Sequence, residues 1–240
     1  SDYHPQYVGI FTGGTAESAC VSQADLIILI GVDPVEFVLQ TWRYQVPIID
    51  ISVVEYPVHY MKPDVGLYGP ISINVSALLG NISVWRSDWK LPAIEALRHD
   101  MNHTLQCQVD QGIGPQDVVQ VALESALAMQ AVHQQTRLPL ITVDAGAHMF
   151  SVMAFWPCDQ PLDVLISNGL ATMVYALPAA IAAAVKTPDR MVMAFTGDGG
   201  LLMCLGELST AVEQAVPIIV IVFNDQSLSL IDIKQQASGL

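Results

Sequence analysis

Two oxygen-bearing side chains follow apolar stretches at a spacing that suits a cation held beside a phosphate. Asp198 lies in the run Gly197-Asp198-Gly199-Gly200, and 24 residues separate Gly199 from Asn224. Carboxylate and amide oxygens, completed by phosphate oxygens and water, form the shell that Mg²⁺ prefers. Glycines let a backbone approach a phosphate closely. The pattern therefore indicates a site for a magnesium-bound phosphate group.

The elements around these residues favour this interpretation over an ordinary turn. A strand at 191–196 ends just before the glycines, and a strand at 217–224 ends at Asn224. Ligands bind at the carboxyl ends of strands in open α/β sheets, where neighbouring parallel strands bring their ends together. We expect the intervening helix, from about Leu202, to direct its free N–H groups at the anion. Gly-Asp-Gly alone would indicate only a turn.

The whole chain alternates apolar strands with helices, which predicts an α/β fold of two doubly wound parallel-sheet domains. We expect a Rossmann-like domain at 1–82, a linker region at 83–112 and a second domain at 113–240. The expected strands are 24–31, 47–51, 139–144, 163–167, 191–196 and 217–224. The expected helices are 17–23, 35–43, 92–107, 115–135, 146–154, 171–186 and 204–214.

Composition limits the classes of partner. The net charge is −14 with only 9 basic residues, so no basic stripe is available for nucleic acid or an anionic membrane. An anionic ligand must therefore be held by metal, backbone N–H groups and helix ends. With 52% hydrophobic and 13% charged residues, we expect part of the surface to be covered by another subunit.

The four cysteines and the apolar segments point to a cytoplasmic protein. No two cysteines have CxxC spacing, and we read them as reduced thiols rather than as a disulfide framework or a zinc site. The longest apolar segment, 169–185, contains Pro178 and is interpreted as a buried helix, not a membrane span.

The segment GDGGLLMCLGELSTAVEQAVPIIVIVFND resembles the thiamine-diphosphate signature of the acetolactate synthase and 2-oxo acid decarboxylase superfamily. The resemblance implies that Asp198, Asn224 and the backbone carbonyl of Gln226 ligate Mg²⁺. It also implies that Asn224 and the backbone around Gly197, Gly199 and Gly200 contact the diphosphate. The second domain is then a thiamine-diphosphate-binding fold.

A second motif, NGLATMVYALPAA at 168–180, is similar to the superfamily segment GLGTMGxxLPAA. The resemblance implies that Met173 supports the bent cofactor, and that backbone groups of Ala171 and Met173 bond its aminopyrimidine. Ala171 and Val174 stand where the superfamily pattern has glycines. Taken alone, Met173 would be read as core filler.

A third motif, VDAGAHMF at 143–150, resembles the superfamily stretch TDVGxHxMW and is one residue shorter after the histidine. It places Gly146, Ala147 and His148 at the diphosphate, largely through backbone contacts. The residues leave open whether His148 is structural or also reaches the substrate.

The first half is similar, more weakly, to the middle domain of the same enzymes at 4–14 and 24–31. That domain binds FAD in acetolactate synthase. No GxGxxG fingerprint is present, so FAD stays an open alternative without support from the residues. Complete members are more than twice as long and begin with a pyrimidine-binding domain, whose Glu activates the cofactor. We find no such domain and expect this chain to be part of a longer protein, with 113–240 truncated at its end.

The resemblance implies a cytoplasmic homodimer or homotetramer acting on a small 2-oxo acid, with no catalytic residue assigned in this chain. The favoured activity is decarboxylation with carboligation, as in acetolactate synthase, which is transferase or lyase chemistry. A simple non-oxidative 2-oxo acid decarboxylase and a non-catalytic cofactor-binding homologue stay open as alternatives.

Overall fold

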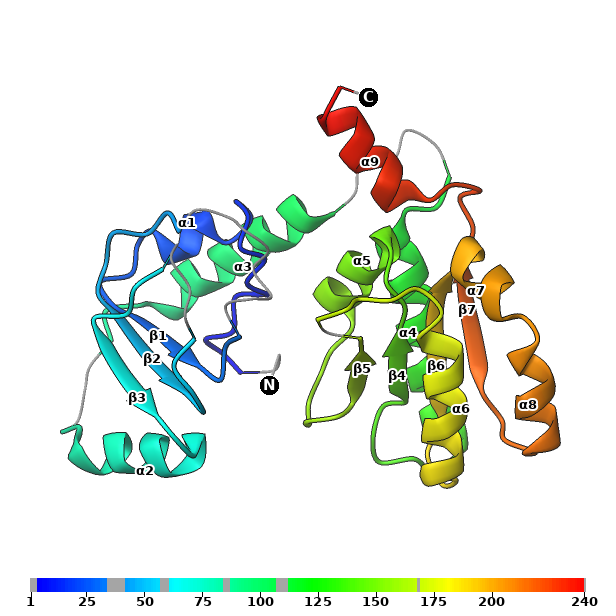
Figure 1. The fold of residues 1–240 in the computed structure, drawn as a ribbon. Coiled ribbons are helices and arrows are strands. Elements are labelled where there is room, and N and C mark those ends of the chain that lie inside the picture. Colours follow the sequence, from blue (N-terminus) through cyan, green and yellow to red (C-terminus); the bar gives the residue numbers. More distant parts are fainter. Residues whose placement is uncertain are drawn as a thin grey trace. The chain divides into compact units, whose positions relative to one another are not determined.

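A computed structural model describes residues 4–33, 42–56, 61–83, 87–106, 112–167 and 169–239. The chain divides into two compact units, one of residues 5–104 and one built around residues 105–240. Each unit contains one parallel sheet flanked by helices (Figure 1). The α/β class with two parallel sheets is confirmed.

The first unit has a sheet of three strands in the order β1-β2-β3. Leu29, Ile48 and Met61 form its buried apolar centre. The predicted helix at 35–43 lies, apart from its last two residues, outside the described residues. The elements are α1 Ser18–Val21, β1 Ile27–Ile30, β2 Ile48–Ser52, β3 Val65–Tyr68, α2 Ile71–Asn81 and α3 Leu91–Leu105.

Three of these elements differ from the sequence-based expectations. β3 and α2 were not predicted, because β3 contains a glycine and α2 buries none of its residues, so neither has a clear apolar pattern. Helix α3 occupies much of the expected linker region. Arg98 on α3 donates hydrogen bonds to the carbonyls of Tyr7 and Pro5, so this helix is joined to the start of the first unit, to which it belongs.

The second unit has a sheet of four strands in the order β5-β4-β6-β7. The chain leaves β4 toward β5 on one side and returns to β6 on the other, so the winding reverses between β4 and β6. Such a reversal is where open α/β sheets bind ligands. The elements are α4 Pro115–Val132, β4 Leu140–Val143, α5 Ala147–Phe155, β5 Val164–Ile166, α6 Ala176–Lys186, β6 Val192–Gly197, α7 Asp198–Cys204, α8 Glu207–Glu213, β7 Ile219–Phe223 and α9 Ser229–Ala237.

Alternate residues of β4 and β6 face opposite sides of the sheet, and helices cover both sides. This explains why these strands are nearly continuous apolar runs in the sequence. Ile141 and Phe195 face one side of the sheet and pack with residues of α4 and α5, including Val119 and Val152. The intervening residues, such as Ala194, face α6, whose alanines form the opposite apolar layer. Both faces are therefore covered, as Figure 1 shows for α4 and α6.

Three predicted helix boundaries are wrong. α6 begins at Ala176 rather than 171, because Ala171 and Val174 have positive φ angles of 46° and 75°, which end a right-handed helix. The helix expected from about Leu202 begins at Asp198, the first helical residue after β6. The helix expected at 204–214 is divided at Gly206 into α7 and α8. No helix in the described ranges is long and apolar enough to cross a membrane.

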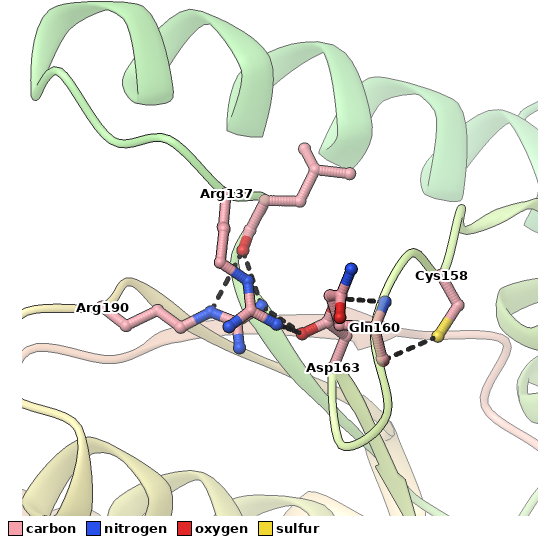
Figure 2. A network of polar contacts seen from close by, with 6 residues as sticks. Arg137, Cys158, Gln160, Asp163 and Arg190 are labelled. Atoms are coloured by element: carbon pink, nitrogen blue, oxygen red, sulfur yellow. Dashed lines mark hydrogen bonds and ion pairs between the residues drawn. The ribbon is translucent and has the colours of Figure 1, made fainter. Parts of the chain in front are cut away.

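A buried carboxylate joins the segments that enter β4, β5 and β6 (Figure 2). Asp163 accepts hydrogen bonds from the guanidinium groups of Arg137 and Arg190, and from the backbone N–H of Gln160 at 3.0 Å. Arg190 Nη2 lies 2.8 Å from Asp163 Oδ1 and also donates to the carbonyl of Leu138. The two ion pairs therefore connect the amino ends of three neighbouring strands.

We expect Asp163→Ala to lower the free energy of unfolding by about 3 kcal/mol, because it leaves the mostly buried Arg190 without its counter-charge. Arg137→Ala should cost less than about 1 kcal/mol, since the Arg137 side chain is 49% exposed. Urea denaturation measures both values. Asp189→Ala removes an exposed carboxylate beside Arg190 in the sequence and should change stability by less than about 0.5 kcal/mol. Equal losses of stability for Asp163→Ala and Asp189→Ala would contradict the role of Asp163 as the counter-charge of Arg190.

Candidate functional site

The predicted metal-binding side chains emerge from neighbouring strands at the same edge of the second sheet. Gly197 pairs with Phe223 in the parallel register of β6 and β7. Asp198 and Asn224 are the residues that follow this pair, and they are half-buried and exposed, respectively. Gln226 has a left-handed backbone with φ 59°, which is uncommon for a non-glycine residue. The chain therefore turns sharply just after β7.

The metal donors predicted at this edge are all oxygen atoms. The predicted set consists of one carboxylate, one amide and one backbone carbonyl, which suits Mg²⁺ completed by phosphate oxygens and water. The described residues contain no cluster of three or more His, Cys, Asp or Glu side chains. The neighbouring Asp225 accepts hydrogen bonds from Ser227 N and Ser229 Oγ, so its carboxylate is engaged in the turn before α9.

The glycines that follow Asp198 lie where a larger side chain would not fit. A Cβ on Gly199 would come within 3.0 Å of Leu228 Cδ2 and 3.8 Å of Met173 Cε. A Cβ on Gly200 would lie 2.4 Å from Asp144 Oδ2. The Gly-Asp-Gly-Gly run is therefore in contact with residues of the other two sequence motifs, which lie far from it along the chain.

His148 lies in the first turn of α5 and is 92% buried. Its ring stacks on Phe223 with 5.1 Å between centroids, and Nε2 has no partner among the described residues. Burial lowers the pKa of His148, opposed by Asp144, Asp225 and a backbone contact at Phe195. Burial therefore favours the neutral imidazole, and its buried Nε2 is available to a ligand.

Gly146 and Gly197 lie against the His148 ring. A Cβ on Gly146 would be 2.8 Å from His148 Nδ1, and a Cβ on Gly197 would be 3.6 Å from the same atom. Ala147 is the first residue of α5. The third motif is thus packed against the end of β6, so all three motifs meet at one edge of the sheet.

The two residues that replace superfamily glycines keep a glycine-like backbone. Ala171 and Val174 have left-handed φ angles of 46° and 75°. This conformation is uncommon for alanine and an outlier for a β-branched residue. The chain therefore turns before α6 at the cost of backbone strain at these two residues.

We expect Ala171→Gly to raise the free energy of unfolding by about 1 kcal/mol, because glycine adopts φ 46° without the steric cost of a Cβ and Ala171 is exposed. Ala182→Gly is the matched control, since Ala182 is exposed within α6. It should lower stability by about 1 kcal/mol. Chemical denaturation of the two variants should give changes of opposite sign; a loss of stability in both would show that Ala171 is not strained.

Comparisons with known proteins agree with this geometry. Residues 144–240 match the family described as thiamine pyrophosphate enzyme, C-terminal TPP binding domain. Acetolactate synthase of Bacillus subtilis (strain 168) is 27% identical over 241 residues, which cover 98% of this chain and 41% of the relative. Residues 144–240 therefore belong to the thiamine-diphosphate enzyme family, and the chain as a whole is similar to acetolactate synthase.

Other members of the thiamine-diphosphate superfamily match in the same way. Catabolic acetolactate synthase of Raoultella terrigena is 30% identical over 234 residues, covering 95% of this chain and 40% of the relative. The large subunit of acetolactate synthase isozyme 1 from Escherichia coli (strain K12) is 41% identical over 96 residues, covering 40% of this chain and 17% of the relative. The chain spans about two fifths of the length of the relatives that match it throughout.

Three residues at this edge of the second sheet were not singled out from the sequence. Asp144 and Thr196 share a buried hydrogen bond, and Leu228 lies against Gly199. Asp144 follows a strand as Asp198 does, so its position offered a signal. No local pattern indicates the contact of Leu228, because it depends on how the turn after β7 folds back.

Proposed function

We propose that this chain provides the diphosphate- and magnesium-binding part of a thiamine-diphosphate site in an enzyme that acts on a 2-oxo acid. The observation that supports this most is the meeting of three motifs at the carboxyl edge of β4, β6 and β7. There, the crowded glycines 199 and 200, Met173 and the unpaired Nε2 of His148 lie together. In the same proposal, residues 1–82 are part of a middle domain, 83–112 a linker and 113–240 the diphosphate-binding domain.

The proposed metal ligands are Asp198, Asn224 and the carbonyl of Gln226. A diphosphate brings several negative charges, and this chain has only 9 basic residues. A divalent cation held by Asp198 therefore balances much of the charge that Lys and Arg would otherwise balance.

The proposed diphosphate contacts are made by backbone rather than by charged side chains. The absence of a Cβ at Gly146, Gly197, Gly199 and Gly200 allows close approach to a phosphate oxygen. Ala147 belongs to the same set through its backbone, and His148 adds an imidazole nitrogen, Nε2, without a partner among the described residues. These groups bind and orient the ligand without moving a proton.

The backbone of Ala171 and the side chain of Met173 are proposed to hold the other half of the cofactor. Thiamine diphosphate, when bound, supplies the nucleophilic carbon and the electron sink that cleavage next to a carbonyl requires. The chain's own share is orientation and the exclusion of water from the site. We assign no catalytic acid or base to this chain.

The proposed reaction is decarboxylation of a 2-oxo acid with transfer to a second carbonyl. The support is the similarity of this chain to two acetolactate synthases, at 27% and 30% identity. A homodimer or homotetramer in the cytoplasm belongs to the same proposal.

Calorimetric titration of the full-length protein with thiamine diphosphate, with and without Mg²⁺, tests the proposal. We expect saturable binding that depends on Mg²⁺, and no binding under either condition would refute it. Incubation with pyruvate then separates the activities: acetolactate supports carboligation, and acetaldehyde alone shows a simple decarboxylase. Tight binding without turnover of a 2-oxo acid panel would make the protein a non-catalytic homologue.

A further inference from the structure

A single buried carboxylate lies beneath the three motifs. Asp144 directly follows β4 and is 1% exposed. Its Oδ1 accepts hydrogen bonds from the backbone N–H of Tyr175 at 2.9 Å and of Ala145 at 3.2 Å. Its Oδ2 accepts the hydroxyl of Thr196 at 2.9 Å. The donors belong to the segments that carry Gly146–His148, Ala171–Met173 and Gly197–Gly200.

The same carboxylate sets the position of the first turn of α7. A Cβ on Gly200 would lie 2.4 Å from Asp144 Oδ2 and 2.9 Å from Thr196 Oγ1. Because Asp144 Oδ2 and Thr196 Oγ1 are hydrogen-bonded to each other, neither atom can move away from Gly200 without breaking that bond. The backbone of Gly200 is therefore seated directly on the Asp144–Thr196 pair.

Asp144 also holds the strained segment before α6. The N–H that it binds belongs to Tyr175, which follows Val174 with its φ of 75°. Strained conformations persist only where the surrounding structure over-determines them. The hydrogen bond from Tyr175 to Asp144 is a direct restraint of that kind, and it acts two residues from Met173.

Burying a carboxylate is costly unless hydrogen bonds compensate, and apolar packing would fill the same volume without that cost. Among the described residues, Arg137 and Arg190 pair with Asp163, and no ion pair reaches Asp144. Its hydrogen bonds instead end on three different segments. Asp144 therefore fixes the positions of these three segments relative to one another.

We propose that Asp144 is a positioning residue that holds the three cofactor-facing segments in their binding geometry before thiamine diphosphate arrives. This inference rests on the proposed function for the identity of the ligand. Asp144 acts through Tyr175, Thr196 and Gly200 and does not itself touch the cofactor. Such supporting groups keep a binding site within the tolerance that its ligand requires.

The first test compares affinity with stability in the full-length protein. Asp144→Ala should weaken Mg²⁺-dependent binding of thiamine diphosphate about 10- to 100-fold, the range typical of groups that orient ligands. Thr196→Val, which removes one of the three donors, should give a smaller loss. Asp144→Asn retains one acceptor oxygen and should restore part of the affinity. Calorimetry measures binding, and thermal unfolding of each apoprotein measures stability.

Thr142→Val is the matched control. Thr142 is buried in β4, and its hydroxyl donates to the carbonyl of Ala176 at 2.8 Å, so it also joins β4 to the start of α6. Its loss should lower the melting temperature with little change in affinity. If Thr142→Val and Thr196→Val lower affinity in proportion to their loss of stability, Asp144 and its partners have only a structural role.

A second readout needs no cofactor. In the apoprotein, Asp144→Ala should speed hydrogen exchange at the Tyr175 amide, and Thr142→Val should not. Gly200→Ala should reduce thermal stability strongly in the wild-type background and less in Asp144→Ala, where the added methyl fits the vacated space. Unchanged exchange, or additive effects of the two substitutions, would overturn the proposal. If the wild type binds no thiamine diphosphate while these apoprotein results hold, the proposed function fails and the positioning role stands.

Discussion

Replacement of Asp198 with alanine is expected to weaken the binding of thiamine diphosphate in the presence of Mg²⁺ by about 100-fold or more. Asp198 is the only carboxylate in the predicted ligand set, and it emerges from β6 beside Asn224 at the end of β7. Loss of groups that merely orient metal ligands costs 10- to 100-fold. Loss of the charged ligand itself should cost at least as much. Titration calorimetry at fixed Mg²⁺ measures the change.

Asp225→Ala provides the matched control, because it also removes one negative charge, in this case from the loop after β7. The carboxylate of Asp225 is engaged with Ser227 and Ser229, so we expect little change in affinity for the cofactor. Asn224→Ala should fall between the two, since it removes a neutral oxygen donor. Equal losses for Asp198→Ala and Asp225→Ala would show that general electrostatics, and not metal ligation, governs binding.

Phe195→Ala is expected to lower the free energy of unfolding by about 3 to 5 kcal/mol. Phe195 is fully buried in β6, a central strand of the second sheet. Its ring packs edge-on against Trp156 at 5.4 Å and lies 6.3 Å from the ring of Phe223. Truncation leaves a cavity between the sheet and α5 that the surrounding residues cannot close without moving a strand. Guanidinium denaturation measures the loss.

Phe150→Ala is the control for the loss of an aromatic side chain. Phe150 lies on α5 and is 56% exposed, so its truncation should cost less than about 1 kcal/mol. A cost at Phe195 no larger than at Phe150 would contradict the packing described for the second unit. Because Phe223 also stacks on His148, Phe195→Ala should additionally reduce cofactor affinity.

Much of the second unit was predictable because its signals are local. The strands β4, β6 and β7 are short apolar runs that end at polar or glycine residues, and parallel sheets bring such ends to one edge. The 24 residues between Gly199 and Asn224 suffice for a helix followed by a strand. The spacing therefore predicted that the two residues lie at the same edge of the sheet. β3 and α2 were not predictable in this way, since neither buries a regular apolar face.

Helix boundaries were less predictable than helix positions. The run from 171 to 186 is mostly apolar and rich in alanine, the best helix former, so the pattern predicts a helix from its first residue. The helix begins only at Ala176, because the backbone at Ala171 and Val174 is held left-handed. One restraint on it comes from Asp144, which lies 31 residues earlier in the chain than Tyr175.

By itself, the sequence determined the α/β class and the resemblance to the superfamily, and it predicted Asp198 and Asn224 as oxygen donors, because residue type, spacing and strand ends are properties of short segments. Only the tertiary structure decided that Asp144, Tyr175, Thr196 and Gly200 form one buried unit. These contacts join residues 31 and 52 positions apart. They depend on the register of β4 against β6 and on burial that excludes water, and neither is a property of any local pattern.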